Sequence, residues 1–126
     1  MITELQSALT CEILTGADAK TPYTRDESRL LPEGEALAVV LPETTEDVSQ
    51  TLKWANENRV PVSIRGAGTG LAGGAVAYQD GIVIALDKMN KILSIDVDNK
   101  LADIQPGVIT AELDAAANEH GLFFCA

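Results

Sequence analysis

Short apolar runs and one stretch of helical spacing set the pattern in the middle of the chain. Residues 36–41 are all apolar and end at Pro42, which predicts a short buried strand. Residues 60–64 alternate apolar and polar side chains and predict a second strand. The intervening residues 44–58 repeat apolar side chains at helical intervals, so the first structural unit is expected to be β-α-β.

The start and the buried face of this helix can be predicted from single residues. Thr44 is placed to cap the helix, and Asp47 follows three residues later to complete a capping box. The helix is expected to end near Asn58. Its apolar stripe is expected to comprise Val48, Leu52 and Ala55, with Trp54 at the edge of the packing.

Strand patterns dominate the region after residue 80. Residues 81–87 predict a further strand, and the alternation through residues 93–97 predicts the next one. Asp98 and Asn99 are suited to a hairpin turn, from which the chain returns through residues 102–104. An antiparallel hairpin is therefore expected after the β-α-β unit.

A second helix is expected between residues 110 and 121. Thr110 is placed to cap it, and Gly121 is placed to end it. Its inner face is predicted to consist of Leu113, Ala116 and Ala117. Residues 122–124 are apolar and predict the beginning of another strand, and because the sequence stops there, we expect it to be part of a longer protein.

The first 35 residues mix apolar and turn-forming residues, and they predict a leading helix followed by an irregular arm. No chemistry is expected there, and the carboxylates of Asp26 and Glu27 are interpreted as solvated. The predicted organisation is a helix and arm over residues 1–35 and an incomplete domain over residues 36–126. The predicted fold class is α+β, with a small β-α-β subdomain and the start of a second, antiparallel subdomain.

Composition and charge restrict the function classes. Of the 126 residues, 46% are hydrophobic and 22% are charged, as in an ordinary globular domain. The formal net charge of −10 disfavours binding to nucleic acid or anionic lipid. The longest apolar run is far shorter than the roughly 20 residues of a membrane-spanning helix, and no secretory signal is visible, so a cytoplasmic protein is expected. Cys11 and Cys125 have no metal-binding spacing and are interpreted as buried or incidental thiols.

The most informative segment is residues 65–75, R-G-A-G-T-G-L-A-G-G-A, in which five of eleven residues are glycine. Glycine tolerates positive φ and lets the backbone approach a ligand, so successive N–H groups can converge on phosphate oxygens. The alternative is a flexible surface turn, but Ala67, Leu71 and Ala72 are apolar, whereas linkers are richer in serine and charge. The segment therefore favours a phosphate-binding loop.

Two familiar glycine motifs match this segment only in part. Gly68, Gly70 and Gly73 have the G-x-G-x-x-G spacing of dinucleotide-binding domains, which would indicate a nicotinamide-binding module. Such a loop must open into a helix, yet only residues 75–80 separate the glycines from the next predicted strand. A P-loop is also disfavoured, because residues 74–75 are not the lysine and serine or threonine that this motif requires.

The order of elements around the glycines resembles a known family. The pattern R-G-x-G-T-G-L-x-G-G-A, between a β-α-β unit and a hairpin ending in Q-P-G-V, is similar to the FAD-binding domain of vanillyl-alcohol-oxidase and p-cresol-methylhydroxylase (PCMH) type oxidoreductases. Within that family, Leu37 to Phe124 resembles the FAD-linked oxidase branch, which includes D-lactate dehydrogenases and glycolate oxidase flavin subunits. The resemblance implies a PCMH-type fold and FAD as the cofactor.

The resemblance also implies roles for particular residues. The N–H groups of residues 66–70, with the hydroxyl of Thr69, would bind the FAD pyrophosphate, while residues 105–108 would pass near the flavin and Pro42 near the adenine. Some relatives attach flavin covalently through a histidine at the position of Thr69, so noncovalent binding is expected here. Arg65 is expected to contact either the pyrophosphate or a surface carboxylate. The expected cofactor-binding residues are Arg65, Gly66, Ala67, Gly68, Thr69, Gly70, Leu71, Gly73, Gly74, Pro106 and Gly107.

The implied reaction is the oxidation of a D-2-hydroxy acid, such as lactate or glycolate, by hydride transfer to FAD, with electrons then passed to another acceptor. The catalytic residues would lie beyond residue 126, and the chain alone would be inactive. A homo-oligomer or a partner subunit fits this reading. A nicotinamide-binding module and a non-catalytic fragment of a split flavoprotein remain alternatives.

Other titratable side chains are not assigned to a site. His120 lies in the last turn of the second predicted helix, where a structural role is expected. Asp96, Asp98 and Asp103 are interpreted as a hydrated face of the hairpin, because no histidine or cysteine is near enough in sequence to complete a metal site. No metal is expected.

Overall fold

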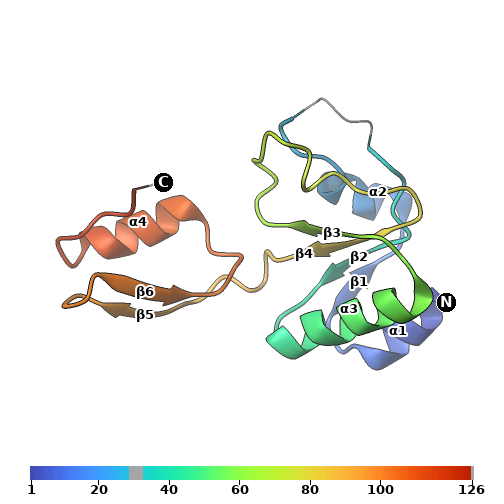
Figure 1. Cartoon of the computed structure of the whole chain (residues 1–126), viewed down its shortest axis with the longest axis horizontal. Coiled ribbons are helices and arrows are strands. Elements are labelled where there is room, and N and C mark those ends of the chain that lie inside the picture. The colour runs from blue at the N-terminus through green and yellow to red at the C-terminus, as the bar shows by residue number, and fades with distance from the viewer. Residues whose placement is uncertain (29–32, 126) are drawn as a thin grey trace. The chain divides into compact units, whose positions relative to one another are not determined.

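The computed structural model describes residues 1–28 and 33–125 and divides into two compact units (Figure 1). The first unit comprises Met1–Lys88 and the second Met89–Ala126, described through Cys125. Each unit contains its own sheet. In the described ranges, no helix is both long and apolar enough to cross a membrane.

The first unit is built on a four-stranded sheet with the strand order β1-β2-β4-β3. The strands are β1 (Glu12–Leu14), β2 (Ala38–Leu41), β3 (Val62–Arg65) and β4 (Ile82–Ala85). β4 pairs in parallel with both β2 and β3, whereas β1 pairs antiparallel with β2. All residues of the central strands β2 and β4 are buried, as expected for strands covered on both faces. This arrangement confirms the predicted β-α-β unit.

The helix α3 (Thr45–Asn58) connects β2 to β3 and begins with the predicted capping box. The hydroxyl of Thr44 accepts a hydrogen bond from Asp47 N–H at 3.1 Å, and the Asp47 carboxylate accepts one from Thr44 N–H at 3.2 Å. The helix ends where Arg59 adopts a left-handed conformation with φ of 54°. Both predicted ends of the helix are confirmed.

The predicted buried face of α3 is only partly correct. Ala55 is buried as predicted, but Leu52 is 40% exposed. Trp54, expected at the edge, is 7% exposed and packs in the core with the sheet and the N-terminal helix. Thr51 is also fully buried. Its hydroxyl can be buried because it donates a hydrogen bond to the carbonyl of Asp47 at 2.7 Å, within the helix. The helix is thus rotated toward Thr51 and Trp54 relative to the predicted stripe.

Alternate residues of β2 and β4 pack on opposite faces of the sheet. Figure 1 shows α1 (Ile2–Ala8) and α3 on one side of the sheet and α2 (Ala17–Lys20) on the other. The core on the side of α1 and α3 includes Leu5, Leu9, Ala38, Val40, Trp54, Ala55 and Ile82. The core on the opposite face includes Ala36, Val39, Leu41, Ala77, Val83 and Ala85. This alternation with a period of two residues is typical of β-strands. The glycine-rich segment connects the end of β3 to the start of β4.

The N-terminal segment is more regular than predicted. After α1 it forms β1, which extends the sheet, and then α2 and the 3-10 helix η1 (Thr21–Tyr23). The ammonium of Lys88 donates to the carboxylate of Glu12 at 2.7 Å, so the segment after β4 is joined to β1. The prediction of an irregular arm is wrong for residues 12–23, because three strand residues are too few to show an alternating pattern.

The second unit begins with the predicted hairpin. β5 (Ile92–Asp96) and β6 (Leu101–Ile104) pair antiparallel. In the turn, the side-chain amide of Asn99 donates to the Asp96 carboxylate at 2.7 Å, and Lys100 takes a φ of 56°. Hydrogen bonding from Asn99 lowers the pKa of Asp96, which is exposed as predicted. The turn is therefore held by side-chain hydrogen bonding rather than by a glycine.

The helix α4 (Thr110–Asn118) follows the hairpin. Ile109 is its N-cap residue, without a side-chain hydrogen bond, and Thr110 is already helical, so the predicted cap is wrong by one position. Leu113 and Ala117 are buried as predicted. The apolar face of the helix therefore agrees with the sequence pattern although its start does not.

The chain after α4 differs from the prediction. Gly121 has a φ of 72° and its N–H donates to the carbonyl of Asn118 at 3.1 Å, which confirms the predicted end of the helix. Residues 122–125 form no strand, which corrects the strand predicted there. The N–H of Phe124 instead donates to the carboxylate of Asp114 at 2.9 Å, so a helix side chain takes the place of a strand partner.

Candidate functional site

The connection between β3 and β4 contains no helix. β3 ends at Arg65 and β4 begins at Ile82, and residues 66–81 consist of turns and coil. Residues 66–75 are called the glycine loop below. A dinucleotide-binding motif of the nicotinamide type needs a helix directly after its glycines, so the structure contradicts that alternative.

The backbone of the glycine loop requires glycine at two positions. Gly68 has a φ of 73° and Gly73 has a φ of 81°, in the left-handed region that other residues rarely adopt. A Cβ atom on Gly68 would also collide with the guanidinium of Arg65. At Gly66 and Gly74, a Cβ atom would meet nothing within 4 Å, so the backbone there faces open space. The loop therefore leaves room for a ligand directly beside its main chain.

The N–H groups in the first half of the loop are available to a ligand. In the part of the chain that the structure describes, the N–H groups of residues 66–70 donate no hydrogen bond to another residue. The side chains of Thr69 and Leu71 are exposed, the latter by 73%. Main-chain N–H groups that the fold leaves unused are the donors that a phosphate group requires, so these residues fit a pyrophosphate.

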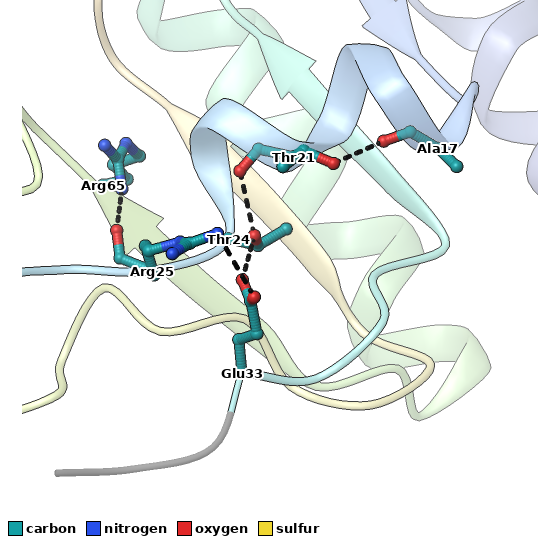
Figure 2. A network of polar contacts seen from close by, with 6 residues as sticks. All are labelled: Ala17, Thr21, Thr24, Arg25, Glu33 and Arg65. Carbon is teal, nitrogen blue, oxygen red and sulfur yellow. Dashed lines mark hydrogen bonds and ion pairs between the residues drawn. The ribbon is translucent and has the colours of Figure 1, made fainter. Parts of the chain in front are cut away.

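Arg65 lies at the end of β3 and folds back over the loop. Its guanidinium donates to the backbone carbonyl of Arg25 (Figure 2) and lies 6.0 Å from the centre of the Tyr23 ring. Among the described residues Arg65 forms no ion pair, so the surface salt bridge that was one of its two expected roles is not found. Its positive charge stays beside Gly68, within the loop.

A segment from the N-terminal region runs beside the glycine loop. This arm segment, residues 21–28, follows α2 in the chain. The N–H of Glu27 donates to the carbonyl of Gly70 at 3.1 Å. The N–H of Ala77, just beyond the loop, donates to the carbonyl of Thr24 at 2.9 Å. The arm segment is therefore hydrogen-bonded both within the loop and after it.

A network of polar side chains stabilises the arm segment (Figure 2). The hydroxyl of Thr21 donates to the carbonyl of Ala17 at 2.9 Å, and the hydroxyl of Thr24 lies at 3.0 Å from the carbonyl of Thr21. The carboxylate of Glu33 accepts from Thr24 and pairs with the Arg25 guanidinium at 3.5 Å. No site residue was predicted in this segment, because its contact with the loop depends on a distant pairing that the sequence pattern does not reveal.

Asp26 is the buried carboxylate of the arm segment. It is 6% exposed, so its interpretation as a solvated group is wrong, whereas Glu27 is exposed as predicted. Its Oδ1 accepts a hydrogen bond from Ser28 N–H at 2.8 Å. Hydrogen bonding from the hydroxyl and N–H of Ser28, with smaller contributions from the N–H groups of Ala75 and Gly73, lowers the pKa of Asp26 against the effect of burial. A negative charge is therefore held against the loop at neutral pH.

The Pro-Gly corner belongs to the second unit. The side-chain carbonyl of Gln105 accepts from Lys91 N–H at 3.0 Å, and Gly107 N–H donates to the carbonyl of Met89 at 2.8 Å. These bonds hold the corner, while Pro106 is exposed. The contact of Pro106 and Gly107 with the flavin stays a prediction.

The remaining candidate residues lie apart from the glycine loop in the sequence. Pro42 is fully buried after β2, and its position near the adenine stays a prediction. His120 is exposed beyond α4. Neither cysteine is fully buried, since Cys11 is partly covered and Cys125 is exposed. Within residues 1–28 and 33–125, no group of three or more His, Cys, Asp or Glu side chains has the geometry to hold a metal ion.

Known proteins are similar to this chain in sequence and in fold. The family described as FAD binding domain matches residues 36–126. The D-lactate dehydrogenase of Anaerostipes hadrus is 36% identical over 124 residues, which cover 98% of this chain and 26% of that protein. The glycolate oxidase subunit GlcD of Bacillus subtilis is 42% identical over 87 residues, which cover 69% of this chain and 18% of that protein.

Similarity extends to solved structures. The structure of p-cresol methylhydroxylase with substrate bound matches with a TM-score of 0.71 and 26% identity, and the match covers 87% of this chain and 22% of that one. This likeness confirms the predicted PCMH-type fold. The chain thus spans only about a quarter of the length of the relatives that it matches.

Proposed function

The chain belongs to the FAD binding domain family, and from this membership we propose that its glycine loop binds the pyrophosphate of FAD in an oxidoreductase that oxidises a D-2-hydroxy acid. FAD is the cofactor of the family. The observation that carries the proposal is the loop itself, in which Gly68 and Gly73 take positive φ and the N–H groups of residues 66–70 have no partner in the described chain.

The acidity of the chain does not oppose this assignment. Exposed charges farther away than a Debye length, about 8 Å at physiological salt, are largely screened. Each hydrogen bond to a charged oxygen contributes roughly 1.5–3 kcal/mol. Several N–H donors from residues 66–70, together with the cation of Arg65 beside Gly68, therefore outweigh the diffuse effect of a net charge of −10.

The contribution of this chain to the reaction is binding and orientation. FAD, when bound, supplies the redox chemistry by accepting a hydride from the substrate. The N–H groups of residues 66–70 and the Thr69 hydroxyl hold the pyrophosphate, and this fixes the position of the rest of the cofactor. Thr69 has no imidazole, through which the covalent relatives bind the flavin, so the cofactor is held noncovalently. The acid–base residues lie outside this chain.

The substrate class rests on the relatives. One is named a D-lactate dehydrogenase and another a subunit of glycolate oxidase, and both names refer to 2-hydroxy acid oxidation. The second name also supports a partner subunit, which would carry electrons from the flavin to an acceptor. These assignments concern the whole protein.

The experiment is to purify the native protein, denature it with acid and identify the flavin in the supernatant. We expect intact FAD in the supernatant, because Thr69 forms no covalent bond, and no flavin in the pellet. The flavin of the untreated protein should then bleach with D-lactate or glycolate under anaerobic conditions and stay oxidised with L-lactate. A protein that neither contains nor takes up FAD would contradict the proposal, and a flavin reduced equally by both lactate enantiomers would remove the D-specific substrate class.

A further inference from the structure

We propose that Asp26 is a positioning residue for the glycine loop: its buried carboxylate packs against the loop at Gly70 and so fixes the backbone whose N–H groups bind the cofactor pyrophosphate. The inference rests on the proposed function and adds to it a residue outside the predicted binding set. Asp26 lies in the arm segment, 40 residues or more before the loop in sequence.

Burial and orientation single out this carboxylate. Asp26 is 6% exposed, and its Oδ2 is buried without a hydrogen-bond partner of good geometry among the described residues. The same atom lies 3.9 Å from the position of a Cβ atom on Gly70, so it faces the loop. A carboxylate that was only a surface solubility group would face water.

The backbone on both sides of Asp26 is fixed to the loop region. The carbonyl of Arg25 accepts from the Arg65 guanidinium, and the N–H of Glu27 donates to the carbonyl of Gly70. These two residues flank Asp26 directly. The backbone of Asp26 is therefore held beside β3 and the loop.

Asp26 and its neighbour contact the loop at Gly70. Oδ2 of Asp26 lies beside Gly70, and the carbonyl of Gly70 accepts from Glu27 N–H at 3.1 Å. Gly70 is the last of the five residues whose N–H groups donate no hydrogen bond within the described chain. Asp26 therefore supports the end of the stretch that is proposed to bind the pyrophosphate.

The test compares the FAD affinities of Asp26→Asn and Glu27→Gln, measured on the full-length protein after its flavin has been removed. Both variants remove one negative charge from neighbouring positions, but only Asp26 is buried. The asparagine side chain keeps one acceptor oxygen and puts an NH2 donor where Oδ2 faces the loop, so we expect FAD to bind roughly tenfold more weakly. Glu27→Gln should bind FAD within about twofold of the wild type. Equal affinities in the two variants, or tighter binding by Asp26→Asn, would overturn the proposal.

Two further measurements separate positioning from general destabilisation. Amide hydrogen exchange of the flavin-free protein should accelerate in residues 67–75 of Asp26→Asn, while the strands β2 and β4 keep their protection. Ser28→Ala, which leaves the Asp26 carboxylate in place, should weaken FAD binding in the same direction by a few fold, and it decides the question if Asp26→Asn does not fold. If the wild type binds no FAD, the proposed function fails, whereas unchanged binding and exchange in both variants refute only the role of Asp26.

Discussion

Gly68 shows how one backbone conformation constrains the candidate site. Its φ of 73° lies in the left-handed region, and the Arg65 guanidinium occupies the space that a Cβ atom would need. A larger residue is therefore opposed by backbone strain, and it would displace the Arg65 guanidinium from the loop. Gly16, outside the loop, has a φ of −69°, and a Cβ there would lie 3.9 Å from the Cβ of Ala19, in ordinary contact.

Gly68→Val should abolish FAD retention and leave the secondary structure largely intact. The strain of a non-glycine residue at this φ is of order 1–3 kcal/mol, and it is relieved by moving the loop and the Arg65 side chain away from the ligand. FAD content per protein and far-ultraviolet circular dichroism measure the two effects. Gly16→Ala is the control and should retain FAD. A Gly68→Val protein with normal FAD content would remove the glycine loop from the binding site.

At the scale of elements, α3 illustrates what local sequence determines. The capping box at Thr44 and Asp47 and the end near Asn58 were predictable, because they depend on residues a few positions apart. The rotation of the helix was not, because it depends on the sheet and on α1. Leu52 is apolar and correctly spaced, yet Trp54 fills the available volume instead.

Trp54→Ala should therefore destabilise the protein far more than Leu52→Ala. Removing a buried tryptophan costs about 3–5 kcal/mol of unfolding free energy, because a cavity remains in the core. A 40% exposed leucine leaves no such cavity, so its loss should cost roughly 1 kcal/mol or less. Urea denaturation of both variants measures the difference. Equal losses would contradict the orientation of α3 in the structure.

The same distinction between local and distant information explains which parts of the site could be predicted. The glycine loop was predictable because its composition and its place between two strands are local properties. The arm segment was not, because Asp26 reaches Gly70 only after residues 21–28 fold beside the loop. The strand predicted at residues 122–124 failed for the related reason that an apolar run forms a strand only where a partner strand is available.

The whole molecule combines a strongly acidic chain with a loop suited to an anionic ligand. The net charge of −10 is spread over exposed carboxylates, of which Glu57 on α3 is one example. Such charges act over a Debye length, about 30 Å at 10 mM salt but about 8 Å at physiological salt. The N–H donors of residues 66–70 act only at hydrogen-bond distance. Salt therefore separates the two contributions to FAD affinity.

The dissociation constant of FAD should change by less than about threefold between 10 mM and 500 mM sodium chloride, because short-range donors are barely screened. Titration of the flavin-free protein followed by flavin fluorescence measures it. Glu57→Gln, which changes the net charge from −10 to −9, should bind FAD as the wild type does at both salt concentrations. Binding that tightens tenfold with salt would show that the diffuse negative charge controls affinity. Binding that weakens steeply would instead assign most of the affinity to the cation of Arg65 rather than to the backbone.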